Sequence, residues 1–323
     1  MEKNDTTQRT SYHWPEDILA ALERGEITAA EAFTRFRQLE SVGGFSDKEP
    51  QTNKEINDVM HELDALVGLE SVKKLVREIK AFIEIQKRRQ HERLVSEPIV
   101  LHMIFRGNPG TGKTTVARIL GKLFRAMGVL PKGHLVEVER ADLVGEYIGH
   151  TAQKTREHLK KATGGILFID EAYSLARGGE KDFGKESVDC LCKYMEDNKE
   201  NIILILAGYR KEMEKFLEVN PGLRSRFPIH MDFPDYTGAE LLEIARRMLQ
   251  QRQYRLAPGA EKELAIRVTG AGYISDAYAG NARLVRNLLE KAIRKQAVRL
   301  VSKPVLTRDD LMTIQYDDLR ERE

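Results

Sequence analysis

A glycine-rich segment that ends in a lysine and two threonines has the spacing of a phosphate-binding loop. Residues 107–114 fit the pattern G-x-x-x-x-G-K-S/T at every fixed position. Glycines let successive backbone N–H groups curl around phosphate oxygens, and a following helix points its positive end at the same oxygens. The lysine can reach the β- and γ-phosphates, and the next hydroxyl can bind Mg²⁺. The residues predicted to bind phosphate are Gly107, Asn108, Pro109, Gly110, Thr111, Gly112, Lys113, Thr114 and the adjoining Thr115.

The elements that such a loop needs on either side are also indicated. The apolar run 99–105 predicts a strand immediately before the loop. Residues 114–127 predict a helix after it, because apolar residues recur there at helical spacing. A chance glycine-rich turn would not carry both, so the context favours a nucleotide site.

A pair of carboxylates follows a second predicted strand. Residues 166–169 are all apolar, and Asp170 and Glu171 come directly after them, with Asp170 57 positions beyond Lys113. Ligands of parallel α/β sheets bind at the carboxyl ends of the strands. Asp170 would hold Mg²⁺ together with Thr114, and Glu171 would act as the general base on the attacking water. Alone, this pair could be a solvated turn. After a phosphate-binding loop, it predicts nucleotide hydrolysis.

The sequence favours ATP over GTP as the nucleotide. Small GTPases read guanine with an Asn-Lys-x-Asp motif after a strand, and this chain has none. The nearest match, residues 198–201, lacks the aspartate. The expected ligands are therefore ATP and Mg²⁺.

Around these residues the chain has three regions that differ in composition and in predicted secondary structure. Residues 1–52 predict a helical N-terminal extension with a capping box at 28–31 and a polar linker up to 52. Residues 53–235 alternate strands (99–105, 134–139, 166–169, 202–207 and 229–233) with helices, which predicts an α/β fold with a mainly parallel five-stranded sheet and flanking helices. Residues 236–323 predict a small α-helical unit with helices near 238–251, 260–268 and 281–300.

Composition excludes several classes of protein. The 323 residues include 52 Lys and Arg against 50 Asp and Glu, a formal net charge of +2, with 41% hydrophobic residues. This balance excludes disordered and fibrous chains, and it argues against bulk electrostatic binding to nucleic acid or a membrane surface. No apolar run approaches the ~18 residues that span a bilayer, and the polar start lacks a signal-peptide core. We therefore expect a cytoplasmic protein without stable nucleic-acid or membrane binding.

Three stretches resemble the AAA+ ATPase superfamily and, more narrowly, its CbxX/CfxQ family. They are residues 107–118, 139–151 and 165–179, within a likeness that covers about 60–300. The resemblance implies a P-loop AAA+ domain followed by an α-helical lid. It also implies ATP hydrolysis in a homo-oligomeric ring, expected to be a hexamer, that acts on a protein client.

The resemblance also implies roles for residues outside the loop and the carboxylates. Arg226, with Arg224 as the second choice, would be an arginine finger that reaches the neighbouring subunit's nucleotide, making Glu171, Arg226 and Lys113 the catalytic set. Arg283 would reach the γ-phosphate from the lid, and Val67 and Gly68 would pack against adenine. The plainer alternatives are a surface arginine for Arg224 or Arg226, a solvated basic helix face for Arg283, and an ordinary turn for the Val-Gly pair.

Two tyrosines fall at further positions of the family pattern. Tyr147 matches the aromatic–apolar–glycine loop that lines the central pore and grips a threaded peptide, although an aromatic residue packed into its own domain would read the same way. Many relatives have Asn or Thr at the end of the fourth strand, as the sensor that orients the attacking water. This chain has Tyr209 there, so the role of Tyr209 as that sensor stays open.

Three functions are compatible with these residues. The first is an ATP-dependent motor that remodels a partner protein, with the resemblance implying a late stage of bacterial endospore formation. The second is a remodelling ATPase that resembles red-type Rubisco activase. The third, from another class, is a nucleotide-switched scaffold or a clamp-loader-like nucleic-acid factor.

Overall fold

The computed structural model describes residues 21–22, 24, 27–28, 31–32, 48–95, 99–145, 147, 149–177, 183–198, 201–269 and 280–320. The chain divides into two compact units, residues 1–58 and 59–323. The boundary falls within helix α3 (Lys48–Asp64). Residues 48–52, which composition alone assigns to the linker, are therefore helical. Residues 51–64 contain no Pro or Gly that would interrupt a helix. Pro50 lies in the first turn of α3, where proline is tolerated.

The described part of the first unit contains the predicted capping box. The Thr28 N–H donates to Glu31 Oε2 at 2.9 Å, and the Glu31 N–H donates to Thr28 Oγ1 at 3.3 Å. Ala21, Ile27 and Ala32 form a small buried cluster beside it. This reciprocal pair satisfies two backbone donors at a helix start, as the S/T-x-x-E pattern predicts.

The second unit is built on one parallel sheet of five strands in the order β2-β3-β4-β1-β5. The strands are β1 (Met103–Gly107), β2 (Leu135–Val138), β3 (Ile166–Ile169), β4 (Ile203–Gly208) and β5 (Ile229–Phe233). All five predicted strands are present, and the first begins four residues later than predicted. At His102 the side chain replaces the backbone as the partner of β4, because its Nδ1 accepts the Leu204 N–H at 3.1 Å.

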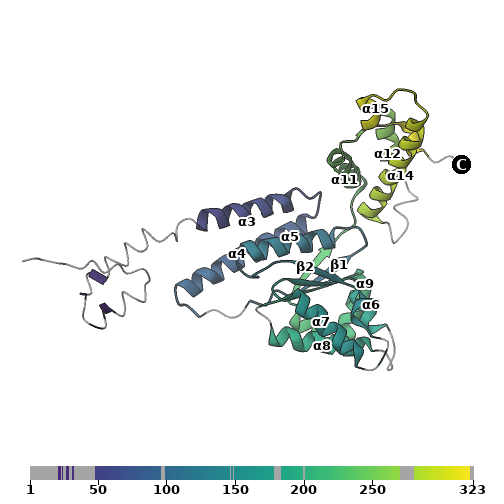
Figure 1. The fold of residues 1–323 in the computed structure, drawn as a ribbon. Coiled ribbons are helices and arrows are strands. Elements are labelled where there is room, and N and C mark those ends of the chain that lie inside the picture. Colours follow the sequence, from purple (N-terminus) through teal and green to yellow (C-terminus); the bar gives the residue numbers. More distant parts are fainter. Residues whose placement is uncertain are drawn as a thin grey trace, which may run out of the picture. The chain divides into compact units, whose positions relative to one another are not determined.

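Helices cover both faces of this sheet (Figure 1). On one side lie α4 (Glu70–His91) and α5 (Lys113–Ala126), and on the other lie α6 (Arg140–Leu143), α7 (His150–Ala162) and α8 (Gly184–Asp197). Short elements follow β3 and β4: the 3-10 helix η1 (Ala172–Ala176), α9 (Arg210–Val219) and α10 (Pro221–Arg226). Nearly all residues of the three inner strands, β3, β4 and β1, are buried, which is the pattern of a parallel sheet enclosed by helices. The α/β fold class is confirmed.

The C-terminal part of this unit is a helical subdomain with its own apolar core. Its helices are α11 (Gly238–Gln251), α12 (Pro258–Thr269), α14 (Asn281–Val301), α15 (Arg308–Met312) and α16 (Tyr316–Leu319). Leu241, Leu264, Val285 and Leu289 belong to that core. Two two-residue strands, β6 (Arg255–Leu256) and β7 (Thr313–Ile314), pair in parallel within it. The three predicted helices of this unit are present, and the short helices α15 and α16 and this strand pairing add to them.

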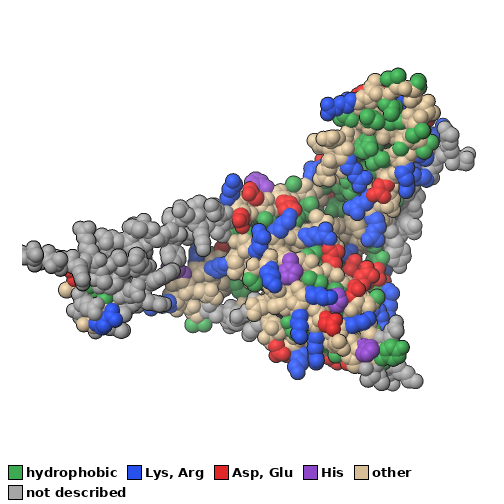
Figure 2. Space-filling view, viewed as in Figure 1, with side chains coloured by type: hydrophobic (Ala, Val, Ile, Leu, Met, Phe, Trp, Pro, Cys, Tyr) green, Lys and Arg blue, Asp and Glu red, His purple; other side chains and the backbone are tan. Residues whose placement is uncertain are grey.

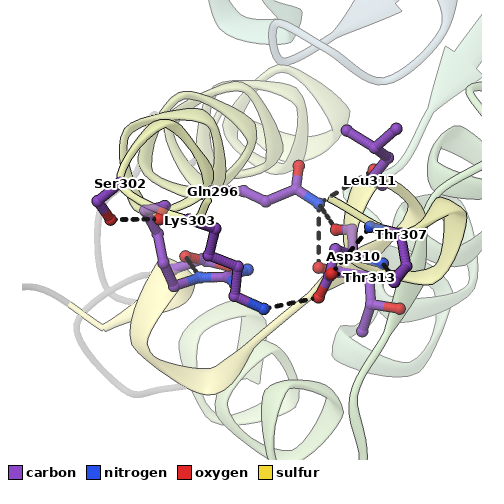
Figure 3. Close-up of polar contacts among 9 residues, drawn as sticks. Gln296, Ser302, Lys303, Thr307, Asp310, Leu311 and Thr313 are labelled. Atoms are coloured by element: carbon purple, nitrogen blue, oxygen red, sulfur yellow. Dashed lines mark hydrogen bonds and ion pairs between the residues drawn. The ribbon is translucent and has the colours of Figure 1, made fainter. Parts of the chain in front are cut away.

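A buried glutamine fastens the last segment of the chain to α14 (Figure 3). Gln296 is 3% exposed, and its Nε2 donates to the carbonyls of Asp310 and Leu311, both at 3.1 Å, and of Thr313 at 3.0 Å. Nearby, Lys303 Nζ donates to Asp310 Oδ1 at 2.8 Å. This bond and those from Thr307 lower the pKa of Asp310 to about 2. The segment 307–319 is thus held by hydrogen bonds as well as by packing.

The surface carries mixed charge. On the face seen in Figure 2, Lys and Arg side chains are interleaved with Asp and Glu rather than gathered into one large basic patch. None of the helices in the described ranges is both long and apolar enough to cross a bilayer.

Candidate active site

A cavity of about 500 Å³ opens where β1 and β3 end. Its lining comes from the glycine-rich loop, from the residues after β3 and β4, and from the segment before α4. The lid contributes the second half of α11 and the start of α14. A second cavity, of about 650 Å³, shares Asp170, Glu171 and Arg283 with the first. The predicted residues that line the first cavity are Val67, Gly107, Pro109, Gly110, Gly112, Lys113, Thr114, Thr115, Asp170, Glu171, Tyr209 and Arg283.

The loop requires glycine for both conformation and space. Gly110 and Gly112 have φ of +73° and +96°, in the left-handed region that other residues rarely adopt. A Cβ on Gly107 would collide with the Phe233 carbonyl, and one on Gly110 would collide with the Gly280 carbonyl. The backbone of the loop is therefore open toward the cavity, and a side chain at either position would displace its neighbours.

Lys113 is the first residue of α5, and its ammonium group is folded back onto the loop. Lys113 Nζ donates to the carbonyls of Gly107 and Asn108, each at 2.8 Å. Burial lowers the pKa of Lys113, and the charge of Asp170 opposes that effect. A phosphate group in the loop would offer this partly desolvated cation anionic oxygens, which are stronger partners than neutral carbonyls. The loop fits the phosphates of a nucleotide.

Two of the predicted phosphate-binding residues have side chains that shape the loop rather than line the cavity. Thr111 is fully buried, and its Oγ1 donates to the Asn108 carbonyl at 2.8 Å. Asn108 Nδ2 donates to both carboxylate oxygens of Asp235, at 2.8 and 3.0 Å. Any contact of these two residues with phosphate would therefore come from their backbone N–H groups.

The two carboxylates stand side by side at the end of β3. Asp170 is half-buried, and its Oδ1 accepts the Glu171 N–H at 3.0 Å. Glu171 is exposed to the cavity and has φ +46° and ψ 43°. A non-glycine residue in this conformation costs about 1–3 kcal/mol and is typical of functional sites. The donor set of Asp170 and Thr114, a carboxylate and a hydroxyl, suits Mg²⁺.

The other end of the cavity is apolar. Val67 lies there with Leu66, Leu69, Ile244 and Met248. Gly68 is not among the lining residues. It has φ +61°, and a Cβ there would meet the Glu240 carboxylate, so Gly68 makes the turn while Val67 faces the cavity. Leu69, Tyr236, Ile244 and Met248 were missed by sequence reasoning, because they come from distant segments with no shared motif.

The first turn of α14 is hydrogen-bonded directly to the phosphate-binding loop. The Ala282 N–H donates to the Gly110 carbonyl at 3.1 Å. Asn281, which is 2% exposed, donates to Asp235 Oδ1 at 2.8 Å and to the Pro109 carbonyl at 3.3 Å, and accepts the Tyr236 N–H at 2.9 Å. Arg283 and, one turn later, Arg286 line the cavity. Arg283 thus lies in the cavity, as the resemblance implies, and Arg286 of the same basic helix face joins it.

Arg226 does not line the cavity and already has a partner on the same chain. It ends α10, and its Nε donates to Glu196 Oε1 of α8 at 2.8 Å, while Nη1 donates to the Gly222 carbonyl at 2.8 Å. The hydrogen bond with Glu196 raises the pKa of Arg226. Arg224, on the same short helix, is exposed.

The two singled-out tyrosines lie in different surroundings. The Tyr147 side chain is 66% exposed, with an edge contact to His150 at 5.5 Å between ring centroids. Gly149, two residues later, has φ +83° and no atom within 4 Å of where a Cβ would stand. Tyr209 follows β4, lines the cavity beside Glu171 and packs partly against the core.

Two family models match the chain in the order of its subdomains. The model for the "ATPase family associated with various cellular activities (AAA)" matches residues 103–235, and the "AAA lid domain" model matches residues 237–323. The chain is an AAA ATPase. It binds nucleotide and hydrolyses ATP, and residues 237–323 are its lid.

Named relatives narrow the family to the CbxX/CfxQ group. The chain is 56% identical over 269 residues to stage V sporulation protein K of Bacillus subtilis, covering 83% of this chain and 84% of the relative. It is 46% identical to the chloroplastic ribulose bisphosphate carboxylase/oxygenase activase of Cyanidioschyzon merolae (82% and 91% covered) and 46% identical to protein CbbX of Cereibacter sphaeroides (81% and 86%). A solved structure of a Thermotoga maritima RuvB mutant superposes with a TM-score of 0.52 at 22% identity, over 80% of this chain and 69% of that one, and shows the shared fold.

Proposed function

We propose that this AAA ATPase is a motor that remodels a partner protein, working as a hexameric ring in the cytoplasm. The observation that carries the proposal is the exposure of Tyr147 on a turn whose Gly149 has open space around it. An exposed aromatic ring beside a glycine with open space around it is accessible to another molecule, as a residue that grips a client must be. In a closed ring of identical subunits, each copy would present its Tyr147 to the same central opening. The tyrosine side chains would grip an unfolded segment of the client there.

The residues of the cavity divide the work of hydrolysis. The N–H groups of residues 107–114, with Lys113 and Arg283, would hold the phosphates, while Val67 and the apolar wall beside it would hold adenine. Thr114 and Asp170 would hold Mg²⁺, which would neutralise phosphate charge. Glu171 would accept a proton from the attacking water. Arg226 would reach the nucleotide of the next subunit, since its place on α10 lies outside the cavity of its own chain.

The lid would carry the nucleotide state to the rest of the chain. Ala282 and Asn281 bond to carbonyls of the phosphate-binding loop, and Arg283 follows them directly. A bound phosphate that shifts Lys113 or Arg283 would therefore also change the angle between α14 and the phosphate-binding loop. Such an angular change, repeated around the oligomeric ring, would move the Tyr147 loops against the client.

The test separates gripping from hydrolysis. Tyr147→Ala should leave the ATPase rate within about twofold of wild type and abolish remodelling of a captured client. Tyr316→Ala, which removes another exposed tyrosine but from the lid, should affect neither. The client would be captured on Glu171→Gln protein, which should hold ATP without turnover. A collapse of ATPase activity in Tyr147→Ala would refute the role of Tyr147 in the pore.

We further propose that the biological role is a late step of endospore formation, in the mother-cell cytoplasm. The support is the 56% identity to the sporulation protein against 46% to the activase. Deletion of the gene should lower the yield of heat-resistant spores, and a normal yield would contradict this role. Release of inhibited red-type Rubisco by the purified protein would favour the activase-like alternative. ATPase stimulation by DNA with a steep salt dependence would favour a nucleic-acid factor instead.

A further inference from the structure

Tyr173 is a buried tyrosine two residues after Glu171, and neither cavity lining includes it. It lies in η1 and is 5% exposed. Within the described part of the chain, its hydroxyl has no partner at full hydrogen-bond geometry. A buried hydroxyl left without a partner costs about 1–3 kcal/mol. Phenylalanine would avoid that cost in the same space, so the hydroxyl needs an explanation.

The aromatic ring of Tyr173 is held on three sides. The Tyr209 ring lies 5.9 Å away between centroids, and the Arg177 guanidinium stands 4.7 Å from the centre of the Tyr173 ring. A Cβ on Gly208 would approach Tyr173 Cδ1 to 2.7 Å, so the end of β4 packs closely against the ring. The position of the hydroxyl is consequently fixed by packing, not by a hydrogen bond of its own.

The charge next to this hydroxyl is Glu171. Burial is the larger cause that raises the pKa of Tyr173, and the charge of the nearby Glu171 carboxylate raises it further. Tyr173 therefore keeps its proton and can only donate to a carboxylate. Glu171 itself is exposed, with its backbone fixed in the left-handed region, so its side chain has room to turn toward the donor.

We propose that Tyr173 is a positioning residue for hydrolysis: its hydroxyl donates a hydrogen bond to the Glu171 carboxylate and holds that carboxylate toward the attacking water. The inference rests on the proposed role of Glu171 as the general base. Because Tyr173 lines neither of the two cavities, it would act through Glu171 rather than on the nucleotide or the water itself. It would supply an anchored donor to the exposed Glu171 side chain, and the Tyr209 ring packs beside that donor.

The test is Tyr173→Phe in the full-length protein, with ATPase kinetics and thermal unfolding measured together. We expect kcat to fall about tenfold, the effect of one oriented hydrogen bond, with KM for ATP unchanged. The melting temperature should stay equal or rise, since an unpaired buried hydroxyl is removed. Tyr194→Phe is the matched control, because it removes another partly buried tyrosine hydroxyl, bonded to Thr163 at 2.9 Å, and should leave kcat unchanged.

A double-mutant cycle separates positioning from general packing. In a Glu171→Asp background, whose shorter carboxylate cannot meet the anchored donor, Tyr173→Phe should change kcat by less than twofold. A kcat within twofold of wild type in Tyr173→Phe alone, or an equal loss in both backgrounds, would overturn the proposal. Glu171→Gln tests the underlying role separately: if that variant still turns over ATP, Glu171 is not the base, whatever Tyr173 does.

Discussion

The arginines of the nucleotide cavity and the arginine at the end of α10 (the α10 face) lie in different surroundings. Arg283 and Lys113 both line the cavity. On α10, Arg226 is bound to Glu196 of the same chain and does not line the nucleotide cavity. The cavity is lined by residues of one chain, whereas Arg226 would act as the proposed finger only where a second copy supplies a nucleotide.

The largest expected effect on activity comes from removing Arg226, which tests this difference between the two regions. Arg226→Ala should lower the ATPase rate of the assembled protein by about 10³–10⁵-fold, the usual contribution of an arginine finger, and leave the Kd for ATP unchanged. Arg224→Ala is the matched control: Arg224 is exposed on the same helix, and its loss should cost far less. Steady-state kinetics and nucleotide titration measure the two quantities.

Mixing inactive variants shows whether Arg226 acts on a neighbour. Lys113→Ala protein should bind no nucleotide but keep its finger, whereas Arg226→Ala protein keeps the cavity and lacks the finger. A mixture should regain part of the activity that neither variant has alone. A mixture as inactive as its components would place Arg226 in the site of its own chain and remove the contrast between the two regions.

What the sequence could predict follows from how local each feature is. The glycine-rich loop, the Asp170–Glu171 pair and the five strands are contiguous stretches, so their patterns predicted them. The apolar wall of Leu69, Tyr236 and Met248 joins three distant segments and depends on packing that no local pattern encodes. Likewise, the partner of Arg226 lies 30 positions away on α8. No sequence pattern distinguishes Glu196 from the other acidic residues on that helix.

A second prediction concerns acid stability on the α10 side. Burial lowers the pKa of His102 to about 4, and its ring lies 5.8 Å from that of Phe227, the residue after Arg226. The unfolded chain, with a histidine pKa near 6.5, takes up the proton first. Stability from neutral His102 is therefore complete above about pH 6.5 and is lost as the pH falls toward 4, by roughly 3 kcal/mol in all.

His102→Gln isolates this contribution, since glutamine can still accept the Leu204 N–H but does not titrate in this range. Urea unfolding at several pH values should show a flatter profile for His102→Gln than for wild type between pH 6.5 and 4. Carboxylates titrate alike in both proteins and cancel in the difference. Parallel profiles would mean that the imidazole is hydrated in solution and contributes nothing.

A third prediction breaks the link between lid and loop within one chain. Asn281→Ala should destabilise the protein by about 1–3 kcal/mol, because the Tyr236 N–H and the Asp235 carboxylate would lose a buried partner. The positive φ of Asn281, 44°, makes alanine worse still. ATP affinity should also fall, which calorimetry can measure. Asn287→Ala, exposed on the same helix, is the control, and an equal loss of affinity there would exclude a specific link.

The smallest expected effect concerns the partner that holds Arg226. Glu196→Gln removes the charge from a surface ion pair, and such pairs contribute about 1 kcal/mol or less. Freed from Glu196, the finger should engage a neighbouring nucleotide more readily, raising the ATPase rate at limiting protein concentration by up to about fivefold. At saturating protein concentration the ATPase rates of Glu196→Gln and wild type should converge. Assembly is then complete in both proteins, and the neighbouring subunit's phosphate competes with Glu196 for Arg226. A lower rate in Glu196→Gln at every concentration would instead mean that Glu196 presents the arginine correctly, and the α10 face would then be preformed in the same sense as the cavity.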